Sequence, residues 1–430
     1  MAKVLIVGGG AAGLMAAGAA VRQGHEVTVL EHMEKPGQKI LVTGKGRCNV
    51  TNDCTAEEFL RHVRTNPRFL FSSLGAFPPA RTMELFEGLG VELKVERGRR
   101  VFPVSDRAEE IRQALLRYAE EARIVRDGAQ KLLLEPLAPA EEAAPAVPEN
   151  PRHPKKKKTG AACRCIGVRG TSGREYRADA VLVATGGLSY PTTGSTGDGY
   201  KLAEQAGHTI VEPVPSLVSL VSHDPDCKKM MGLALKNVTL TLFEDGKAIF
   251  DEQGEMLFTH FGISGPLTLS ASSHLGDMKK HRYHAEIDLK PALSEEQLYD
   301  RITRDFALLA NHAAQGALVK LLPSSMQPVM VARWGIDPAT RANQITREQK
   351  RELVQLMKHW RVSIDARGDL AHAVITSGGV SVREVDPKTM QSKKALGLYF
   401  AGEVLDVDAY TGGYNLQIAF CTAQSFANNL

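Results

Sequence analysis

The sequence predicts an α/β protein whose parallel sheet uses both ends of the chain and is interrupted by an antiparallel insertion and a small helical subdomain. First, an apolar run at residues 3–7 leads into a glycine turn and an alanine-rich helix. Second, residues 397–402 and 414–426 show a strand and helix pattern again near the end of the chain. Third, short and largely alternating segments, typical of antiparallel strands, lie between them at 217–222, 237–243 and 283–289.

Length and composition set the limits of this prediction. A chain of 430 residues is too long for one ordinary core, so we expect two or three domains. Hydrophobic residues make up 43% and charged residues 24%, which excludes disordered, collagen-like and coiled-coil proteins. The net charge of +4 tolerates a nucleic acid partner without requiring one. The six cysteines show neither CxxC nor zinc-ligand spacing, so we expect reduced thiols, a cytoplasmic protein and no metal site.

The first elements form a nucleotide-binding turn. Gly8, Gly10 and Gly13 give the pattern GxGxxG directly between a strand and a helix, where glycines permit a tight turn and close approach of a pyrophosphate. A second strand ends at Glu31, which is placed to accept hydrogen bonds from ribose hydroxyls. The uncharged residues 4–21 include five glycines and six alanines, so they are too weakly hydrophobic to predict a membrane span. The GxGxxG motif by itself does not decide between NAD and FAD as the bound cofactor.

Helix start signals define the middle of the chain. Ser294 with Gln297 and Thr346 with Gln349 have the capping-box form, so each pair predicts the beginning of a helix. The apolar residues that follow recur at helical spacing, which predicts packing faces and not a cofactor-binding surface. These residues are Leu298, Ile302, Phe306, Leu353, Met357 and Trp360.

Changes in composition mark the expected domain boundaries. Residues 135–160 contain six prolines and the lysines 155–158, which predicts a solvated surface loop, with a basic segment that touches phosphate as the alternative. We expect the nucleotide-binding domain to comprise 1–190 and 376–430. The insertion would consist of a β-barrel at 191–292, a helical subdomain at 293–360 and a return through the barrel at 361–375.

The tail favours FAD over NAD as the resident cofactor. Gly402 and Glu403 follow a strand, Asp406 lies three residues further on, and Gly412 and Gly413 open a helix. The first amides of that helix would face flavin N1 and C2=O, where negative charge collects on reduction. No second GxGxxG follows a strand. We therefore expect NADH, or NADPH, to visit the flavin transiently and leave before the substrate enters, which gives ping-pong kinetics.

Four motifs resemble the HI0933-like bacterial flavoproteins. They are residues 39–52 (KILVTGKGRCNVTN), 257–266, 376–380 and 402–415. The resemblance implies a glutathione-reductase-like, Rossmann-type FAD domain made from both chain ends and interrupted by a β-barrel and a helical subdomain. Lys45 departs from the family, which usually has glycine there. We expect FAD to be bound by Gly8, Gly10, Ala12, Gly13, Glu31, Lys39, Arg47, Asn49, Thr185, Gly186, Gly402, Glu403, Asp406, Gly412, Gly413, Asn415 and Leu416.

The resemblance also implies a function. Members are linked to NADH-dependent reduction of uridine to dihydrouridine in large-subunit ribosomal RNA, to reduction of steroid-like enones and to amine oxidation. We expect the first, with ribosomal RNA as partner. Reduction or oxidation of a small enone, steroid-like or amine metabolite is one alternative. A non-catalytic RNA-binding protein in which FAD serves only structure is the other. The sequence leaves the oligomeric state open.

Two side chains are candidates for the acid that protonates the substrate. Cys48 is flanked by Arg47, which would favour a thiol that exchanges its proton near neutral pH. A small buried packing residue is the alternative for Cys48. His260 is a candidate acid or phosphate ligand, with a purely structural histidine as its alternative.

Overall fold

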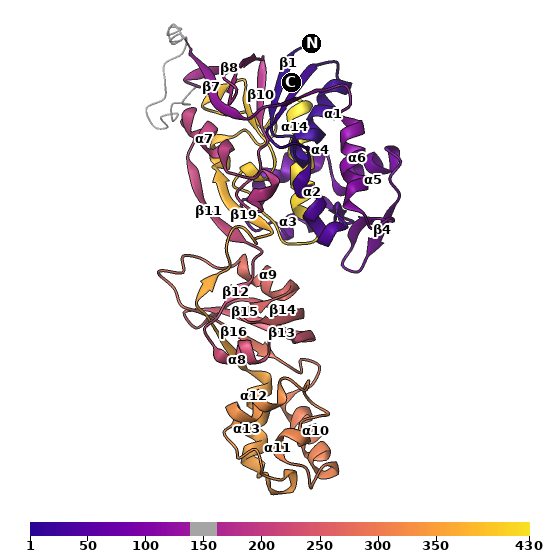
Figure 1. Ribbon diagram of the computed structural model, residues 1–430, viewed down its shortest axis with the longest axis vertical. Coiled ribbons are helices and arrows are strands. Elements are labelled where there is room, and N and C mark those ends of the chain that lie inside the picture. The colour runs from indigo at the N-terminus through magenta and orange to yellow at the C-terminus, as the bar shows by residue number, and fades with distance from the viewer. Residues whose placement is uncertain (138–160) are drawn as a thin grey trace, which may run out of the picture. The chain divides into compact units, whose positions relative to one another are not determined.

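The computed structural model describes residues 1–137 and 161–430, which divide into two compact units (Figure 1). Unit 1 combines Met1–Val214 with Val374–Leu430, and unit 2 is Pro215–Ala373. The insert predicted at 135–160 follows a strand of unit 1, β7 (Ala129–Pro136), which pairs with β8 (Cys163–Gly170). Glu135 and Pro136 still belong to β7 and not to a loop, and residues 138–160 lie outside the described residues.

Unit 1 is built on a five-stranded parallel sheet that contains strands from both chain ends, as predicted. The order is β21 (Leu398–Phe400), β10 (Ala180–Val183), β1 (Lys3–Val7), β2 (Glu26–Glu31) and β6 (Arg123–Arg126). Helices α1 (Ala11–Arg22) and α14 (Tyr414–Ala427) pack against each other in this unit, and their side chains are largely buried. The central strands read as continuous apolar runs because both faces of a parallel sheet are covered.

Smaller sheets and short helices complete unit 1. The antiparallel strands are β3 (Thr51–Asn52), β5 (Arg100–Pro103) and β4 (Leu93–Glu96) in one sheet, and β7 (Ala129–Pro136), β8 (Cys163–Gly170) and β9 (Glu175–Arg177) in another, where β20 (Ala395–Leu396) joins β8 in parallel. Strands β11 (Ile210–Ser216) and β19 (Ile375–Val380) form a further pair. The helices are α2 (Gln38–Val42), α3 (Ala56–Arg61), α4 (Phe71–Ala76), α5 (Pro79–Gly88), α6 (Ala108–Tyr118) and α7 (Asp198–Gln205).

Unit 2 contains a seven-stranded antiparallel sheet, in agreement with the alternating pattern of its sequence. The order is β17 (Trp360–Ile364), β16 (Tyr283–Asp288), β13 (Ala234–Glu244), β14 (Lys247–Thr259), β15 (Gly262–Ser264), β12 (Leu220–Val221) and β18 (Ala366–Arg367). Buried and half-buried residues alternate along β16, so one face of this strand packs into the core. Closure of the sheet into a barrel stays a prediction.

The helical part of unit 2 begins where the capping boxes predict. Ser294 caps α10 (Glu295–Leu308) and Thr346 caps α13 (Arg347–Lys358), each with the reciprocal glutamine contact. The predicted apolar faces are buried in the core of this unit, which α11 (Ala314–Ala317) and α12 (Gln327–Trp334) also join. One assignment was wrong: α13 ends at Lys358, and Trp360 is the first residue of β17, although its side chain is fully buried as expected.

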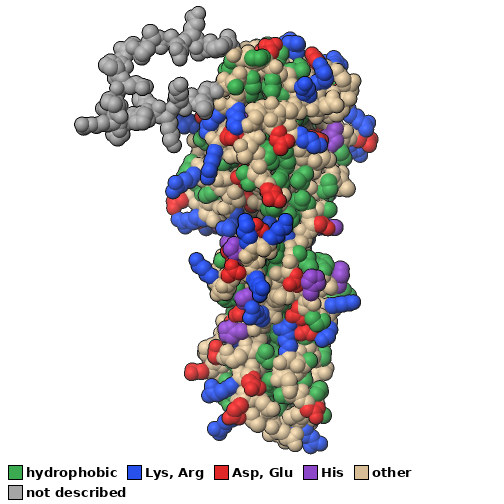
Figure 2. All heavy atoms as spheres, turned by 90° about the vertical axis from the view of Figure 1, so that its left-hand side faces the viewer, with side chains coloured by type: hydrophobic (Ala, Val, Ile, Leu, Met, Phe, Trp, Pro, Cys, Tyr) green, Lys and Arg blue, Asp and Glu red, His purple; other side chains and the backbone are tan. Residues whose placement is uncertain are grey.

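Helix hydrophobicity, the cysteines and the surface charge limit the kinds of partner that fit this chain. Across residues 1–137 and 161–430, no helix has both the length and the hydrophobicity that a bilayer crossing needs. All six cysteines are free thiols. On the face drawn in Figure 2, Lys and Arg side chains are interspersed with Asp and Glu side chains over both units. A nucleic acid partner would therefore have to be recognised at a local site on this face and not by one broad basic field.

Candidate flavin site

The glycine turn between β1 and α1 leaves room for a ligand at one glycine and none at the other two. A Cβ added to Gly8 would lie 2.6 Å from the Ala184 carbonyl oxygen, and one added to Gly13 would lie 1.8 Å from the Gly8 carbonyl oxygen. At Gly10 no atom lies within 4 Å of the same position. Helix α1 starts there without a side-chain cap. Open space beside uncapped helix amides suits a pyrophosphate.

Glu31 lies at the end of β2, next to this turn. Its side chain accepts hydrogen bonds from the backbone N–H of Gly9 at 2.7 Å and from that of Met33 at 2.7 Å. Each carboxylate oxygen retains a second lone pair for a ribose hydroxyl. Ala12 is buried and its Cβ would lie 2.9 Å from a Cβ added to Gly402, so Ala12 contributes close packing between α1 and the tail.

Lys39 and Glu403, which are 364 positions apart in the sequence, meet in a half-buried polar network. The Lys39 ammonium lies 2.6 Å from the Glu403 carboxylate and donates a second bond to the Ser189 hydroxyl at 2.6 Å. Ser189 donates to the same carboxylate at 2.9 Å, as does the backbone N–H of Thr376 at 2.9 Å. These three groups fix Glu403 and the strand-to-helix turn around Gly402 in one conformation.

Three buried polar atoms of unit 1 lack a protein partner among the described residues. They are Thr185 Oγ1, the Tyr200 hydroxyl and Asn49 Oδ1. Burial, with Glu403 and Asp406 nearby, raises the pKa of Tyr200, so its hydroxyl keeps its proton and remains a donor. A buried polar atom without a partner costs about 1–3 kcal/mol. Polar groups of a bound ligand would remove that cost.

Gly186 shapes the loop that leads from β10 to this network. Its φ of +73° is in the left-handed region, and an added Cβ would lie 3.0 Å from the Ser195 hydroxyl. The position therefore requires glycine. The turn at Gly186 directs the backbone from the end of β10 to Ser189.

The start of α14 is packed closely against β3. Gly413 has φ +93°, and an added Cβ would lie 2.3 Å from the Thr51 carbonyl oxygen. Gly412 has φ +130°, and its carbonyl accepts a hydrogen bond from Asn52. The 14-residue helix has no side-chain cap at Gly413, and half-buried Leu416 lies in its first turn. Its free N-terminal amides can stabilise an anionic or carbonyl oxygen, as predicted for the pyrimidine end of a flavin.

Asn415 and Asp406 organise the loop that precedes α14. The Asn415 amide accepts from the Ala409 N–H at 2.9 Å and donates to the Ala409 carbonyl at 2.8 Å. Asn66 donates to the Asp406 carbonyl at 2.7 Å and to its carboxylate at 3.0 Å. Burial raises the pKa of Asp406. Both side chains were expected to bind FAD, and the structure gives them bonds that hold this loop.

The three consecutive residues Arg47, Cys48 and Asn49 have different surroundings. The Arg47 guanidinium lies 2.7 Å from the Glu96 carboxylate, 3.1 Å from that of Asp106 and over the ring of Phe102. The Cys48 side chain is fully buried, and this burial raises its pKa to about 12. Arg47 therefore does not acidify the thiol, because its charge is paired elsewhere. This environment favours the packing role of Cys48 over proton exchange near neutral pH.

His260 belongs to unit 2, whereas the residues above belong to unit 1. It lies in the turn between β14 and β15, and its exposed ring contacts Phe261 edge to face at 4.9 Å. Its role as an acid or phosphate ligand stays a prediction.

Comparison with known proteins decides the family. The profile of the HI0933-like protein Rossmann domain matches residues 2–133 and 151–429. The chain belongs to the HI0933-like family. With the nucleotide-binding turn and the α/β unit described above, this membership identifies an FAD-dependent oxidoreductase.

Two relatives of this HI0933-like protein match over almost their whole length. A 3-dehydro-bile acid delta(4,6)-reductase of Clostridium scindens is 30% identical over 98% of this chain and 97% of the relative. A ribosomal RNA dihydrouridine synthase of Escherichia coli is 29% identical over 99% of this chain and 97% of the relative. Among solved structures, 3-ketosteroid-delta4-(5alpha)-dehydrogenase of Rhodococcus jostii is similar with a TM-score of 0.47 and 16% identity, covering 100% of this chain and 96% of that one.

Two residues of the polar network, and Tyr200 near Glu403, were missed by the sequence analysis. Thr376 lies inside one of the family motifs, which could have indicated it. Ser189 follows the Thr185 to Gly187 turn by two residues, but its role depends on the distant Glu403. Tyr200 lies on α7 with no motif signal, and only its burial without a hydroxyl partner among the described residues indicates it.

Proposed function

We propose that this protein uses NADH, or NADPH, to reduce a carbon–carbon double bond conjugated with a carbonyl, and that its substrate is uridine in large-subunit ribosomal RNA. The observation that carries the proposal is full-length similarity to relatives named ribosomal RNA dihydrouridine synthase, at 29% identity in Escherichia coli and 30% in Haemophilus influenzae. The enzyme would act in the cytoplasm, where this RNA is made.

The residues of unit 1 fit FAD. Open space at Gly10 and the uncapped start of α1 would accept the pyrophosphate, Glu31 the ribose, and the amides before Leu416 the pyrimidine ring. When bound, FAD supplies hydride transfer from the nicotinamide to the substrate. The protein's part is to hold the cofactor rigidly: Lys39, Glu403 and their partners keep the turn at Gly402 in place.

Reduction of the double bond also requires a proton at the carbon next to the carbonyl. Cys48 is not retained as the donor, because its buried thiolate would be strongly disfavoured. His260 remains the proposed donor from the sequence. A His260→Gln variant should bind FAD and be reduced by NADH at an unchanged rate, yet should transfer hydride to substrate at least tenfold more slowly. An unchanged rate of substrate reduction would remove His260 from the reaction.

The experiment that tests the function follows the flavin spectrum under anaerobic conditions. NADH should bleach the yellow holoenzyme, and unmodified ribosomal RNA should restore its colour. Mass spectrometry of the digested RNA should show a uridine that has gained two hydrogens. RNA that already contains the product is the matched control and should leave the flavin reduced. Bleaching without reoxidation by RNA would refute uridine as the substrate. If NADH fails to bleach the flavin while RNA still binds, the protein is a non-catalytic RNA-binding protein.

A small enone is the second candidate substrate. The Clostridium scindens relative, at 30% identity, is named as a reductase of a 3-dehydro-bile acid, in which a ring double bond is conjugated with a ketone. The same reduced holoenzyme should then be reoxidised by 4-androstene-3,17-dione and not by RNA. An amine that itself bleaches the flavin would instead identify an oxidase.

A further inference from the structure

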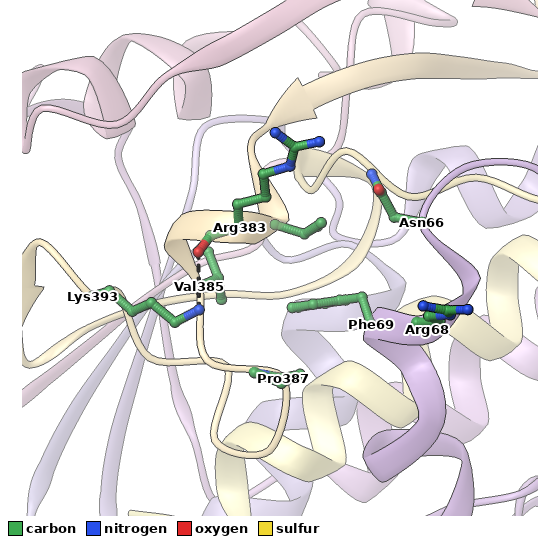
Figure 3. A pocket seen from close by; sticks show the side chains of 8 residues that line it. Asn66, Arg68, Phe69, Arg383, Val385, Pro387 and Lys393 are labelled. Atoms are coloured by element: carbon green, nitrogen blue, oxygen red, sulfur yellow. Dashed lines mark hydrogen bonds between the residues drawn. The ribbon is translucent and has the colours of Figure 1, made fainter. Parts of the chain in front are cut away.

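We infer that a cationic pocket of unit 1 binds a phosphate ester of a nucleotide. The pocket is open to solvent, has a volume of about 290 Å³ and lies between the 3-10 helix η2 (Pro67–Leu70) and the segment that starts at η5 (Val382–Glu384). Arg68, Arg383 and Lys393 line it together with apolar side chains. In Figure 3, Phe69 extends across the pocket toward Val385. None of the residues assigned above to the FAD site lines it.

The three cations of the pocket have charges available for an anion. Arg68, Arg383 and Lys393 are exposed, and none of them forms an ion pair within 4.0 Å among the described residues. Lys393 donates one hydrogen bond to the Arg383 carbonyl at 2.9 Å, which fixes its ammonium at the pocket. An ammonium retains two further donors after one bond, and a guanidinium has five. The pocket thus offers many donors to phosphate oxygens.

Two carboxylates outside the pocket lining interact electrostatically with two of the three cations. The positive charge of Arg383 acts on Asp406, whose carboxylate accepts a hydrogen bond from the Asn66 side-chain amide at 3.0 Å. Asp386 feels the charge of Lys393, but it accepts from the backbone N–H of Lys388 at 2.9 Å and from that of Thr389 at 3.0 Å. No carboxylate side chain lines the pocket itself. An incoming anion would therefore meet net positive charge.

The pocket is joined directly to the predicted flavin-binding segment. Asn66 lines the pocket and also donates to the carbonyl and carboxylate of Asp406. Asp406 follows Glu403 of the polar network by three residues. A phosphate bound here would therefore lie beside the segment that is expected to bind FAD.

The size and lining of the pocket define the ligand class. A volume of about 290 Å³ is at the lower end of small-ligand sites, so it suits one nucleotide unit and not a whole dinucleotide. The cations would hold the phosphate, and the apolar floor of Phe69 and Val385 would receive the sugar or base. Two sources share this chemistry: a backbone phosphate of RNA, which rests on the proposed function, and the phosphates of the visiting nicotinamide nucleotide.

The test uses the FAD-loaded protein and the double variant R68A/R383A. Both side chains are exposed, so the fold should be retained, and flavin content checks this. Arg123→Ala, another exposed arginine of unit 1 on β6, is the matched control. Binding of fluorescein-labelled oligouridylate is measured by anisotropy as a function of salt. The affinity for NADH is measured from the rate of anaerobic flavin reduction.

The expected result is a roughly tenfold loss of oligouridylate affinity. The slope of log affinity against log salt concentration should also become smaller, by the amount that about two phosphate contacts contribute. An unchanged NADH affinity would then identify RNA as the source of the phosphate. A loss of affinity confined to NADH would identify the nicotinamide nucleotide as the source of the phosphate. The charge-retaining variant R68K/R383K should keep most of the affinity. If neither ligand is weakened more than in the Arg123→Ala control, the inference is overturned. These two binding measurements do not depend on uridine reduction. The phosphate site can therefore be refuted while the proposed function stands, and the proposed function can be refuted while the phosphate site stands.

Discussion

Replacing Gly10 by alanine should separate cofactor binding from folding. The backbone at Gly10 has φ −81° and ψ −166°, which any residue adopts, and no protein atom lies within 4 Å of an added Cβ. The methyl group would meet no protein atom, so its cost to the apoprotein is that of replacing a glycine N-cap by the less favourable alanine, about 1 kcal/mol or less. It would occupy the space assigned to the pyrophosphate. Forced contacts of this kind cost about 1–3 kcal/mol.

That range corresponds to a loss of FAD affinity of about 5- to 150-fold. Titration of apoprotein with FAD, followed by quenching of flavin fluorescence, measures it, and thermal unfolding of the apoprotein reports stability. Gly13→Ala is the contrasting variant, because its Cβ would lie 1.8 Å from the Gly8 carbonyl oxygen and should destabilise the apoprotein as well. Gly75→Ala, at an exposed position of α4 with nothing within 4 Å of an added Cβ, is the neutral control. Unchanged FAD affinity in Gly10→Ala would refute the placement of the pyrophosphate.

Three further predictions address strain, the polar network and pH. Lys45 has φ +60°, so Lys45→Gly should raise the free energy of unfolding by about 1 kcal/mol and raise Tm, whereas an unchanged Tm would contradict strain there. Glu403→Gln leaves the Lys39 ammonium without its carboxylate, and should lower the free energy of unfolding by about 1–3 kcal/mol and weaken FAD binding in the same titration. Burial lowers the pKa of His208 to about 4, below its unfolded value near 6.5, so stability present above pH 6.5 should fall by up to about 3 kcal/mol as the pH drops toward 4. Urea unfolding across that pH range checks this, and a His208→Gln variant with the same loss would show that other groups cause it.

The parts of the fold that repeat a local pattern could be predicted from the sequence. The turn at Gly8 to Gly13, the capping boxes at Ser294 and Thr346, and the closing helix after Gly413 all occur where expected. Each depends on contacts within a few residues or on a backbone conformation that glycine alone adopts easily. Trp360 shows the limit of such patterns, because helical spacing continued past Lys358 while the backbone changed to a strand.

The polar network could not be predicted in the same way. Lys39, Ser189, Thr376 and Glu403 come from four separate segments, and no local spacing relates them. Only the packing of β10, β19 and the turn at Gly402 brings these groups within hydrogen-bond distance. The sequence indicated Lys39 and Glu403 through family motifs, but their contact with each other is a property of the tertiary structure.

Adjacent residues in a motif need not share one site, and the segment around Cys48 shows why. Cys48 has φ +59°, a left-handed conformation that turns the chain sharply between its neighbours. Arg47 is consequently paired with Glu96 on the β4–β5 hairpin, while Asn49 keeps a buried oxygen without a protein partner in the described part of the chain. A charge that is one residue away in sequence thus has no effect on the thiol. The glycine-rich segment therefore offers a ligand the Asn49 amide, and the proton that completes reduction has to come from another element.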